Sequence, residues 1–330
     1  MAYRVAVGAN TTFYVGKQVT RGTQLTLWSE FEASEIISLS IEPVITTIPD
    51  PSLYSGVSTR AFYAGGVSWQ GTLKVRANYL GTAQSILLGG VLGTNTAGAI
   101  TESSTQAYLS FIFLRGGMED TPLYERLSNI CMTGFSFKCA AGTGAEGMGT
   151  FEFSFIASTY TSGLAALTGD LPTAPATSPV LFHQANKTTW CDGLRDAVGA
   201  GAIAYRPKAI EIDYRVPLEP SNFIMTSATS LEPARTGLNT CTVKFEESLM
   251  SVTPIVAAST GAANSYKLCV PFVSGATSIT FEAGSSASAR VAAYSGPVEG
   301  YGEVRESITW NCGYNATEVG ALKITNDYTA

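Results

Sequence analysis

The chain has 330 residues, of which 45% are hydrophobic and 14% are charged, and its net charge is −6. This length suffices for two ordinary domains with large cores, and the composition excludes an intrinsically disordered chain. The negative charge argues against a basic protein that grips nucleic-acid phosphates. Abundant Ser and Thr, with 33 Gly and 14 Pro, favour strands and turns. A surface this poor in charge suggests that other subunits cover much of it.

The first half of the chain reads mainly as strands, because apolar and polar residues alternate in several short runs. Strands are expected at residues 35–41 (EIISLSI), 68–77 (SWQGTLKVRA) and 108–114 (YLSFIFL), followed by a hairpin over 131–158. A turn-rich stretch covers residues 46–66.

One helix is expected in this half, over residues 78–92, with Asn78 as a possible N-cap. Its apolar residues form roughly one stripe, which indicates packing on a sheet rather than a ligand site.

A glycine pattern, G-x-G-x-x-G, occupies residues 142–147. A phosphate-binding loop of this kind needs a strand before it and a helix after it. Here both flanking segments, residues 135–139 and 148–156, alternate like strands. The glycines are therefore expected in the connection of a β-hairpin, and nucleotide binding is not expected.

The second half repeats this order of elements with shorter loops. Strands are expected at residues 208–218, 239–247 and 265–273, with a turn-rich stretch at 221–238. The helix position falls at 248–258, where Pro254 allows only a broken helix. A hairpin is expected from 277–282 and 287–294, and a closing strand from 306–308 into 321–325.

The repeated order predicts an all-β fold with minor α. Two tandem β-sandwich or half-barrel domains are expected, over residues 1–175 and 176–330, joined through the Pro- and Thr-containing stretch 169–179. Each domain carries a flanking helix and a long hairpin. Isolated hairpins expose unpaired edges, so neighbouring subunits that continue the sheet around a ring would protect them.

Catalytic and metal-binding patterns are not found in the sequence. The six cysteines lack zinc-knuckle spacing and read as structural thiols. A single histidine, His183, occurs without a nucleophile elbow. The one polar cluster that could be drawn as a site joins His183 and Cys191 to Asp192 and Asp196. We therefore expect no enzyme activity, no metal and no cofactor.

Targeting segments are likewise not expected. The first 16 residues lack the apolar core of a signal peptide, and no run approaches the length of a membrane helix, so membrane insertion is not expected. Assembly in the cytoplasm of the producing cell is the expectation.

With these elements, the sequence resembles the tail tube proteins of long-tailed bacteriophages. The resemblance is one of pattern and covers about two thirds of the chain. The segments that carry it are residues 35–51 (EIISLSIEPVITTIPDP), 67–93 (VSWQGTLKVRANYLGTAQSILLGGVLG), 132–158 (MTGFSFKCAAGTGAEGMGTFEFSFIAS) and 321–327 (ALKITND).

The resemblance implies a structural virion protein. In that family, six β-sandwich domains form a ring, extended hairpins join into a β-barrel around a lumen, and stacked rings conduct the genome. A duplicated chain would form trimers that look six-fold. Implied partners are further copies of the chain and the tail terminator, tape-measure and distal tail proteins, while double-stranded DNA passes without specific binding.

Under this hypothesis the hairpins over residues 133–156 and 278–294 line the lumen. Alternation turns every second residue inward, and acidic side chains are expected there because like charges repel DNA. The alternative is that these charges are solvated on the outer face or pair across strands, because register cannot be read from one sequence. The candidate lumen residues are Lys138, Glu146, Glu152, Glu282 and Arg290.

Residues 49–60, which contain Pro and Gly, and their counterpart in the second half, residues 221–235, are expected to stack one ring on the next. Long loops are usually functional or disordered, which favours this role over that of a plain surface loop. The candidate stacking residues are Pro49, Asp50, Pro51, Tyr54, Arg60, Phe223, Glu232 and Arg235.

Other functions remain open from the sequence. A carbohydrate-binding or adhesin-like β-sandwich of the virion could stack sugars on its aromatic residues, although Trp28, Trp69, Trp190 and Trp310 are scattered along the chain. A β-barrel porin would need a signal peptide and evenly spaced strands.

Overall fold

The structure is a computed structural model in which strands dominate and one α-helix occurs among the described residues. This confirms an all-β fold with minor α. The described residues are 11–49, 62–78, 81–96, 98–115, 123–140, 147–163, 167–172, 194–196, 202–203, 207–219, 233–248, 266–274, 277–283, 289–296, 305–314 and 320–326.

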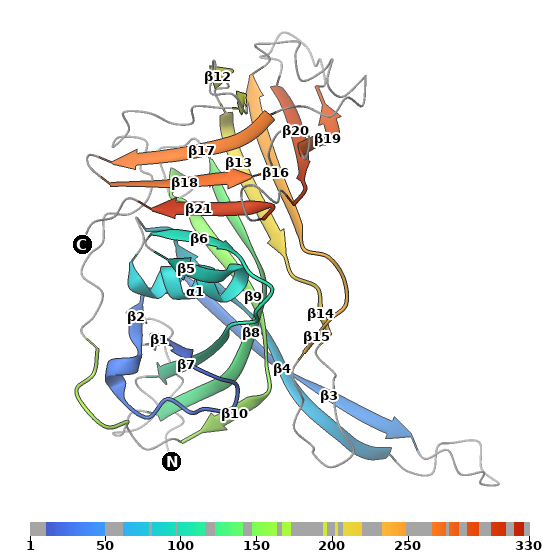
Figure 1. Cartoon of the computed structure of the whole chain (residues 1–330). Coiled ribbons are helices and arrows are strands. Elements are labelled where there is room, and N and C mark those ends of the chain that lie inside the picture. Colours follow the sequence, from blue (N-terminus) through green and yellow to red (C-terminus); the bar gives the residue numbers. More distant parts are fainter. Residues whose placement is uncertain are drawn as a thin grey trace, which may run out of the picture.

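The largest element is an antiparallel sheet, here called the long sheet, to which both halves of the chain contribute (Figure 1). Its strands, from one edge to the other, are β3 (Ser38–Pro49), β4 (Phe62–Arg76), β9 (Thr150–Ala157), β8 (Leu123–Ala140), β13 (Pro207–Arg215), β16 (Thr240–Ser248), β20 (Arg305–Cys312) and β19 (Ala289–Ser295).

The two ends of β8 pair with different strands. Its C-terminal part pairs with β9 and β13, whereas its N-terminal part pairs with β7 (Tyr108–Arg115) and β10 (Thr159–Ser162). Beyond β7 the same layer continues through β1 (Thr11–Gln18) to β2 (Glu32–Ser34). A short 3-10 helix, Trp28–Glu30, precedes β2.

A second sheet crosses the long sheet in Figure 1. Its strands, in order, are β12 (Ala202–Ile203), β11 (Leu194–Asp196), β17 (Tyr266–Ser274), β18 (Thr277–Ala283), β21 (Leu322–Asn326), β6 (Ala99–Glu102) and β5 (Gly93–Thr96). Phe137 on β8 lies 4.9 Å from Phe281 and 5.6 Å from Phe272 between ring centroids, so the two sheets share one core.

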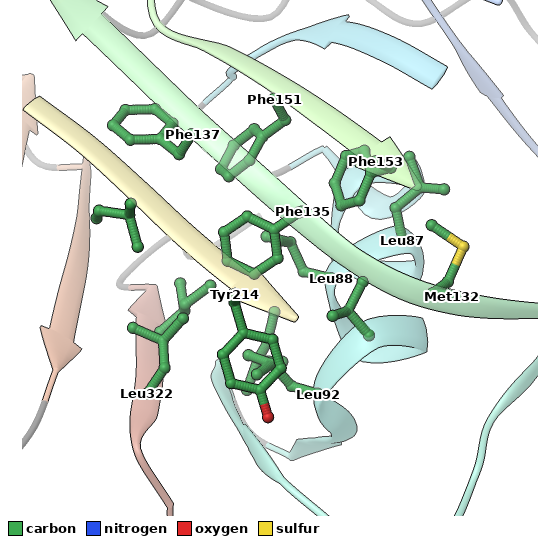
Figure 2. Close-up of a cluster of buried hydrophobic side chains, with 14 of the residues drawn as sticks. Leu87, Leu88, Leu92, Met132, Phe135, Phe137, Phe151, Phe153, Tyr214 and Leu322 are labelled. Atoms are coloured by element: carbon green, nitrogen blue, oxygen red, sulfur yellow. The ribbon is translucent and has the colours of Figure 1, made fainter. Parts of the chain in front are cut away.

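Helix α1 (Thr82–Leu92) packs against that core through Leu87, Leu88 and Leu92 (Figure 2). The residue before the helix is Gly81, so the predicted N-cap at Asn78 is wrong. Asn78 is instead held by the buried Gln84 side chain, which accepts its N–H at 2.9 Å and donates to its carbonyl at 3.0 Å.

Strand pairing recurs along the chain in the same order. In the first half the recurring pairs are β1–β2, β1–β7, β7–β8, β8–β10, β3–β4, β4–β9 and β8–β9, while β5–β6 has no counterpart among the described residues. In the second half they are β11–β12, β11–β17, β17–β18, β18–β21, β13–β16, β16–β20 and β19–β20. The long strand β8 thus corresponds to two strands, β18 and β19.

Several expectations need correction. The segments 277–282 and 287–294 do not form a hairpin: β18 pairs with β17 and β21 in the second sheet, whereas β19 pairs with β20 in the long sheet. Of the stretch 46–66, expected to be turns, residues 46–49 and 62–66 belong to β3 and β4, two long paired strands that project from the body in Figure 1, and the rest lies outside the described residues. Residues 306–308 and 321–325 lie in two strands of different sheets, not in one closing strand.

The sheets do not close into a barrel across the described residues. Two separate tandem domains are not confirmed either, because β8 pairs with β13 and β6 pairs with β21 across the two halves. The expected second helix, residues 248–258, lies outside the described residues except at position 248, which ends β16, and so does most of the expected linker.

Candidate functional site

The surface that stands out is the solvent side of the long sheet, here called the polar face. Side chains alternate across each strand, so one side buries aromatic and aliphatic residues and the other carries charge. The register places one row of this face, from β3 to β19, at Ser38, Lys74, Glu152, Ser136, Asp213, Thr242, Asn311 and Arg290.

The reverse side of the same strands explains why they align. Phe135, Phe137 and Phe151 are fully buried there, as are Ile212 and Val243. A slip of one residue in any strand would turn charged side chains into this core, so burial fixes the register of the polar face.

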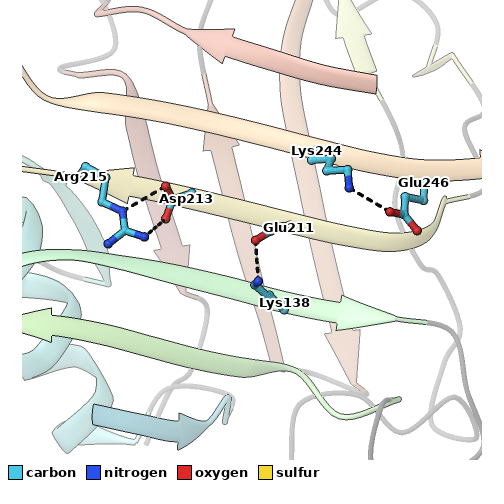
Figure 3. A network of polar contacts seen from close by, with 6 residues as sticks. All are labelled: Lys138, Glu211, Asp213, Arg215, Lys244 and Glu246. Atoms are coloured by element: carbon cyan, nitrogen blue, oxygen red, sulfur yellow. Dashed lines mark hydrogen bonds and ion pairs between the residues drawn. The ribbon is translucent and has the colours of Figure 1, made fainter. Parts of the chain in front are cut away.

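Three ion pairs lie on the polar face (Figure 3). Lys138 Nζ is 2.7 Å from Glu211 Oε1 on the neighbouring strand. Arg215 binds Asp213 two residues away with both Nε, at 3.1 Å, and Nη2, at 2.9 Å.

The third pair, Lys244 Nζ with Glu246 Oε1, spans 3.0 Å along β16. Exposed pairs of this kind add at most about 1 kcal/mol of stability. Their main effect here is that each of these cations already has a carboxylate beside it.

Lys138 sits in the most acidic part of the face. Its hydrogen bond with Glu211 raises its pKa, burial opposes that rise, and the nearby Glu152 and Asp213 carboxylates raise the pKa further. The ammonium therefore stays charged throughout the neutral range, and its charge is shared among three carboxylates.

Of the depressions on and beside this face, two are lined by Lys138. One, of about 290 Å³, is lined by the charged residues around Lys138 and Asp213. The other, of about 350 Å³, lies at the end of β8, between Cys139, Met148 and Ile210. Carboxylates line both depressions, but no three metal-ligating side chains among the described residues are placed so that they could hold a metal ion.

Three of the candidate lumen residues lie on the polar face, and a fourth lies on the second sheet. Lys138, Glu152 and Arg290 share the polar face, Glu152 and Arg290 in the same row. Glu282 lies on β18 of the second sheet, where Lys323 Nζ is 3.2 Å from its carboxylate. Glu146 lies outside the described residues. The described charges of the polar face are of both signs, not mainly acidic.

Sequence reasoning missed the acidic and basic side chains of β13. Glu211, Asp213 and Arg215 occupy alternate positions of a strand whose other side, Ile210, Ile212 and Tyr214, is buried. That alternation was the available signal, but it gives no strand neighbour, so the contact with Lys138 could not be inferred.

The stacking candidates are only partly described. Pro49 ends β3, and Arg235 is exposed on β15 (Ala234–Arg235), which pairs with β14 (Leu218–Glu219). The remaining candidates, Asp50, Pro51, Tyr54, Arg60, Phe223 and Glu232, lie outside the described residues.

The rival sites gain little from the structure. Trp28 and Trp310 are buried, and Trp69 packs on Tyr160 with 4.4 Å between ring centroids, so the described tryptophans form no shared platform for sugars. Of the polar cluster drawn from the sequence, His183, Cys191 and Asp192 lie outside the described residues, and Asp196 ends β11.

Comparison with known proteins gives no family: no protein-family model and no curated protein matches the chain. Among the described residues, none of the helices has the length and apolarity required to cross a membrane.

Proposed function

We propose that the chain is the major tail tube subunit of a long-tailed bacteriophage. In this proposal it is a structural virion protein without catalytic activity. Its copies assemble in the host cytoplasm into rings that stack into a tube, and the lumen of that tube conducts the genome during ejection.

The observation that carries the proposal is the recurrence of strand pairing. Seven of the eight strand pairings within the first half have a counterpart in the second half, in the same chain order; the pairing β5–β6 has none among the described residues. This recurrence supports a duplicated chain with two tube-like domains, even though the identities between the halves are few.

The junction between the halves supplies the rule for assembly. In the long sheet, the first half of the chain contributes β3, β4, β9 and β8, in that spatial order, and the second half contributes β13, β16, β20 and β19. The two halves meet where β8 pairs antiparallel with β13. The counterparts of these strands are β19 and β3, and each pairs on one side only among the described residues. Repeating the junction between chains would place β19 of one copy against β3 of the next.

This head-to-tail contact generates a ring if the rotation closes. Closure also pairs both exposed edges, which otherwise invite aggregation. Three copies of a duplicated chain would supply the six domains that the resemblance implies.

In such a ring the polar face is one surface of a continuous barrel, and we assign it to the lumen. Three of its cations, Lys138, Arg215 and Lys244, carry carboxylate partners, which suits a surface along which DNA slides without sticking. Lys138, Glu152 and Arg290 then keep the predicted lumen role, joined by Glu211, Asp213, Arg215, Lys244 and Glu246. The tail terminator, tape-measure and distal tail proteins stay proposed partners of the tube ends.

Electron microscopy of the purified chain over a range of concentrations tests the proposal. We expect rings or tubes with a central hole, six-fold in projection, and a native mass of three chains per ring. Single particles of one chain at all concentrations, also in the presence of tail-initiating proteins from the same phage, would contradict it.

A further inference from the structure

Two of the buried cysteines face one another across adjacent strands. Cys241 on β16 is the register partner of Cys312 on β20, and both point into the core with 2% and 6% of their surface exposed. Both thiols are free. Opposite residues of antiparallel strands have Cα atoms about 4.5–5.5 Å apart, which lies inside the range that a disulfide bridges.

The other described cysteines have no such arrangement. Cys131 lies opposite Ile156, Cys139 opposite Ile210, and Cys269 opposite Glu282. A bond between Cys241 and Cys312 therefore needs no change of strand register, whereas none of the other three cysteines has a cysteine as its register partner.

We propose that Cys241 and Cys312 are a latent disulfide site, closed by a two-electron oxidant of the peroxide class. One thiolate attacks a peroxide oxygen, the O–O bond breaks, and a sulfenic acid forms as hydroxide leaves. The second thiolate then attacks that sulfur, forming the S–S bond and breaking the S–O bond. The two thiols lose two electrons in total, and hydrogen peroxide becomes two waters.

The setting of the pair makes its oxidation slow. The hydrogen bond to Cys312, and then burial, raise the pKa of Cys241 well above its ordinary value. A protonated, buried thiol is a poor nucleophile, so the pair stays reduced in a reducing cytoplasm and closes only on sustained exposure to peroxide. The new bond would tie β16 to β20 across the loop from residue 241 to 312. This inference is independent of the tube proposal.

Peptide mapping of the oxidised full chain tests the inference. The purified chain is treated with hydrogen peroxide, catalase removes the excess, and N-ethylmaleimide blocks the remaining thiols in denaturant before digestion without reduction. We expect a peptide pair linked through Cys241 and Cys312, lost on reduction, and a raised urea midpoint of the oxidised chain.

Two controls make the outcome decisive. Cys139→Ser removes a buried cysteine that lies opposite Ile210 and should keep the link, whereas Cys312→Ser should abolish it. Mixing isotope-labelled and unlabelled chains should give no mixed-label pair. Three results would overturn the proposal: a link through other cysteines, a mixed-label pair, or full alkylation of Cys241 and Cys312. The mapping of the unsubstituted chain decides even where a variant fails to fold.

Discussion

Glu211 is the residue on which the charge balance of the polar face depends most directly. It neutralises Lys138 at 2.7 Å from the neighbouring strand. Replacing it by Gln keeps the size of the side chain but leaves the ammonium available to a phosphate. We expect Glu211→Gln to bind double-stranded DNA more tightly, with a log–log salt slope steeper by about one, as measured by fluorescence anisotropy of labelled DNA.

A matched variant separates this local effect from the change in net charge. Glu32 is an exposed carboxylate on β2, away from the polar face, and Glu32→Gln adds the same charge. Its salt slope should equal that of the unsubstituted chain. Equal steepening in both variants would show that net charge, rather than the Lys138–Glu211 pair, governs binding.

Tyr214 predicts a pH effect on stability. The ring is fully buried, stacks on Phe135, and its hydroxyl accepts a 2.7 Å hydrogen bond from Asn239 Nδ2. Burial raises its pKa, and the charge of Glu102 adds to the rise.

The sign follows from proton linkage. Because the folded pKa is the higher one, this contribution is fully present below the ordinary tyrosine value near 10 and is lost as pH rises above it. Between pH 10 and 11 the free energy of unfolding should fall by about 1 kcal/mol more in the unsubstituted chain than in Tyr214→Phe. Urea titrations at the two pH values measure this, and parallel losses would contradict it.

At the scale of elements, the β8–β13 pairing depends on a glycine. A Cβ at Gly134 would collide with the backbone carbonyl of Tyr214 and come within 3.0 Å of the Arg215 side chain. Since the obstacle is backbone, the two strands must separate. We expect Gly134→Ala to lower the free energy of unfolding by about 1–3 kcal/mol, measured by urea denaturation.

Gly237→Ala serves as the comparison. A Cβ there would meet only Pro217, at an ordinary 3.4 Å, so the change should stay within about 0.5 kcal/mol. Similar losses in both variants would mean that the strand junction is looser than its register indicates.

The elements themselves were largely predictable, because alternation along a strand is a local signal. The strands around Leu73, Phe111 and Phe137 follow such runs, and so does the hairpin of β8 and β9. The partner of each strand was less predictable. The β18–β19 hairpin was favoured because the segments are neighbours, yet β18 pairs with the preceding strand β17, up to the register partners Ser274 and Thr277.

The candidate site shows the same limit. Alternation made Lys138 and Glu152 candidates for the lumen side of a hairpin, but Glu211 became their neighbour only through the pairing of strands far apart in sequence. Pairing energies between strands depend on cross-strand packing, which one sequence does not display. The polar face is therefore a product of topology more than of any local motif.

At the scale of the whole molecule, the long sheet ends in two edges that nothing covers among the described residues. Edge β3 carries Leu39 and Ile41, half-buried on the apolar side, and edge β19 carries Val291 and Tyr294 in the same setting. An isolated chain would expose both edges to unspecific pairing. Head-to-tail closure removes this hazard for every copy at once, and it predicts which edges meet.

Cysteine cross-linking between copies tests that contact directly. One chain carries Ser38→Cys on β3 and a second, isotope-labelled chain carries Arg290→Cys on β19, since these positions end the same row of the polar face. After mixing, assembly and copper-catalysed oxidation, we expect a mixed-label peptide pair joining positions 38 and 290. With Thr72→Cys on β4 in place of Ser38→Cys, no such pair should form, because β4 lies between β3 and β9. Equal cross-linking of positions 38 and 72 would mean that the copies meet by another surface.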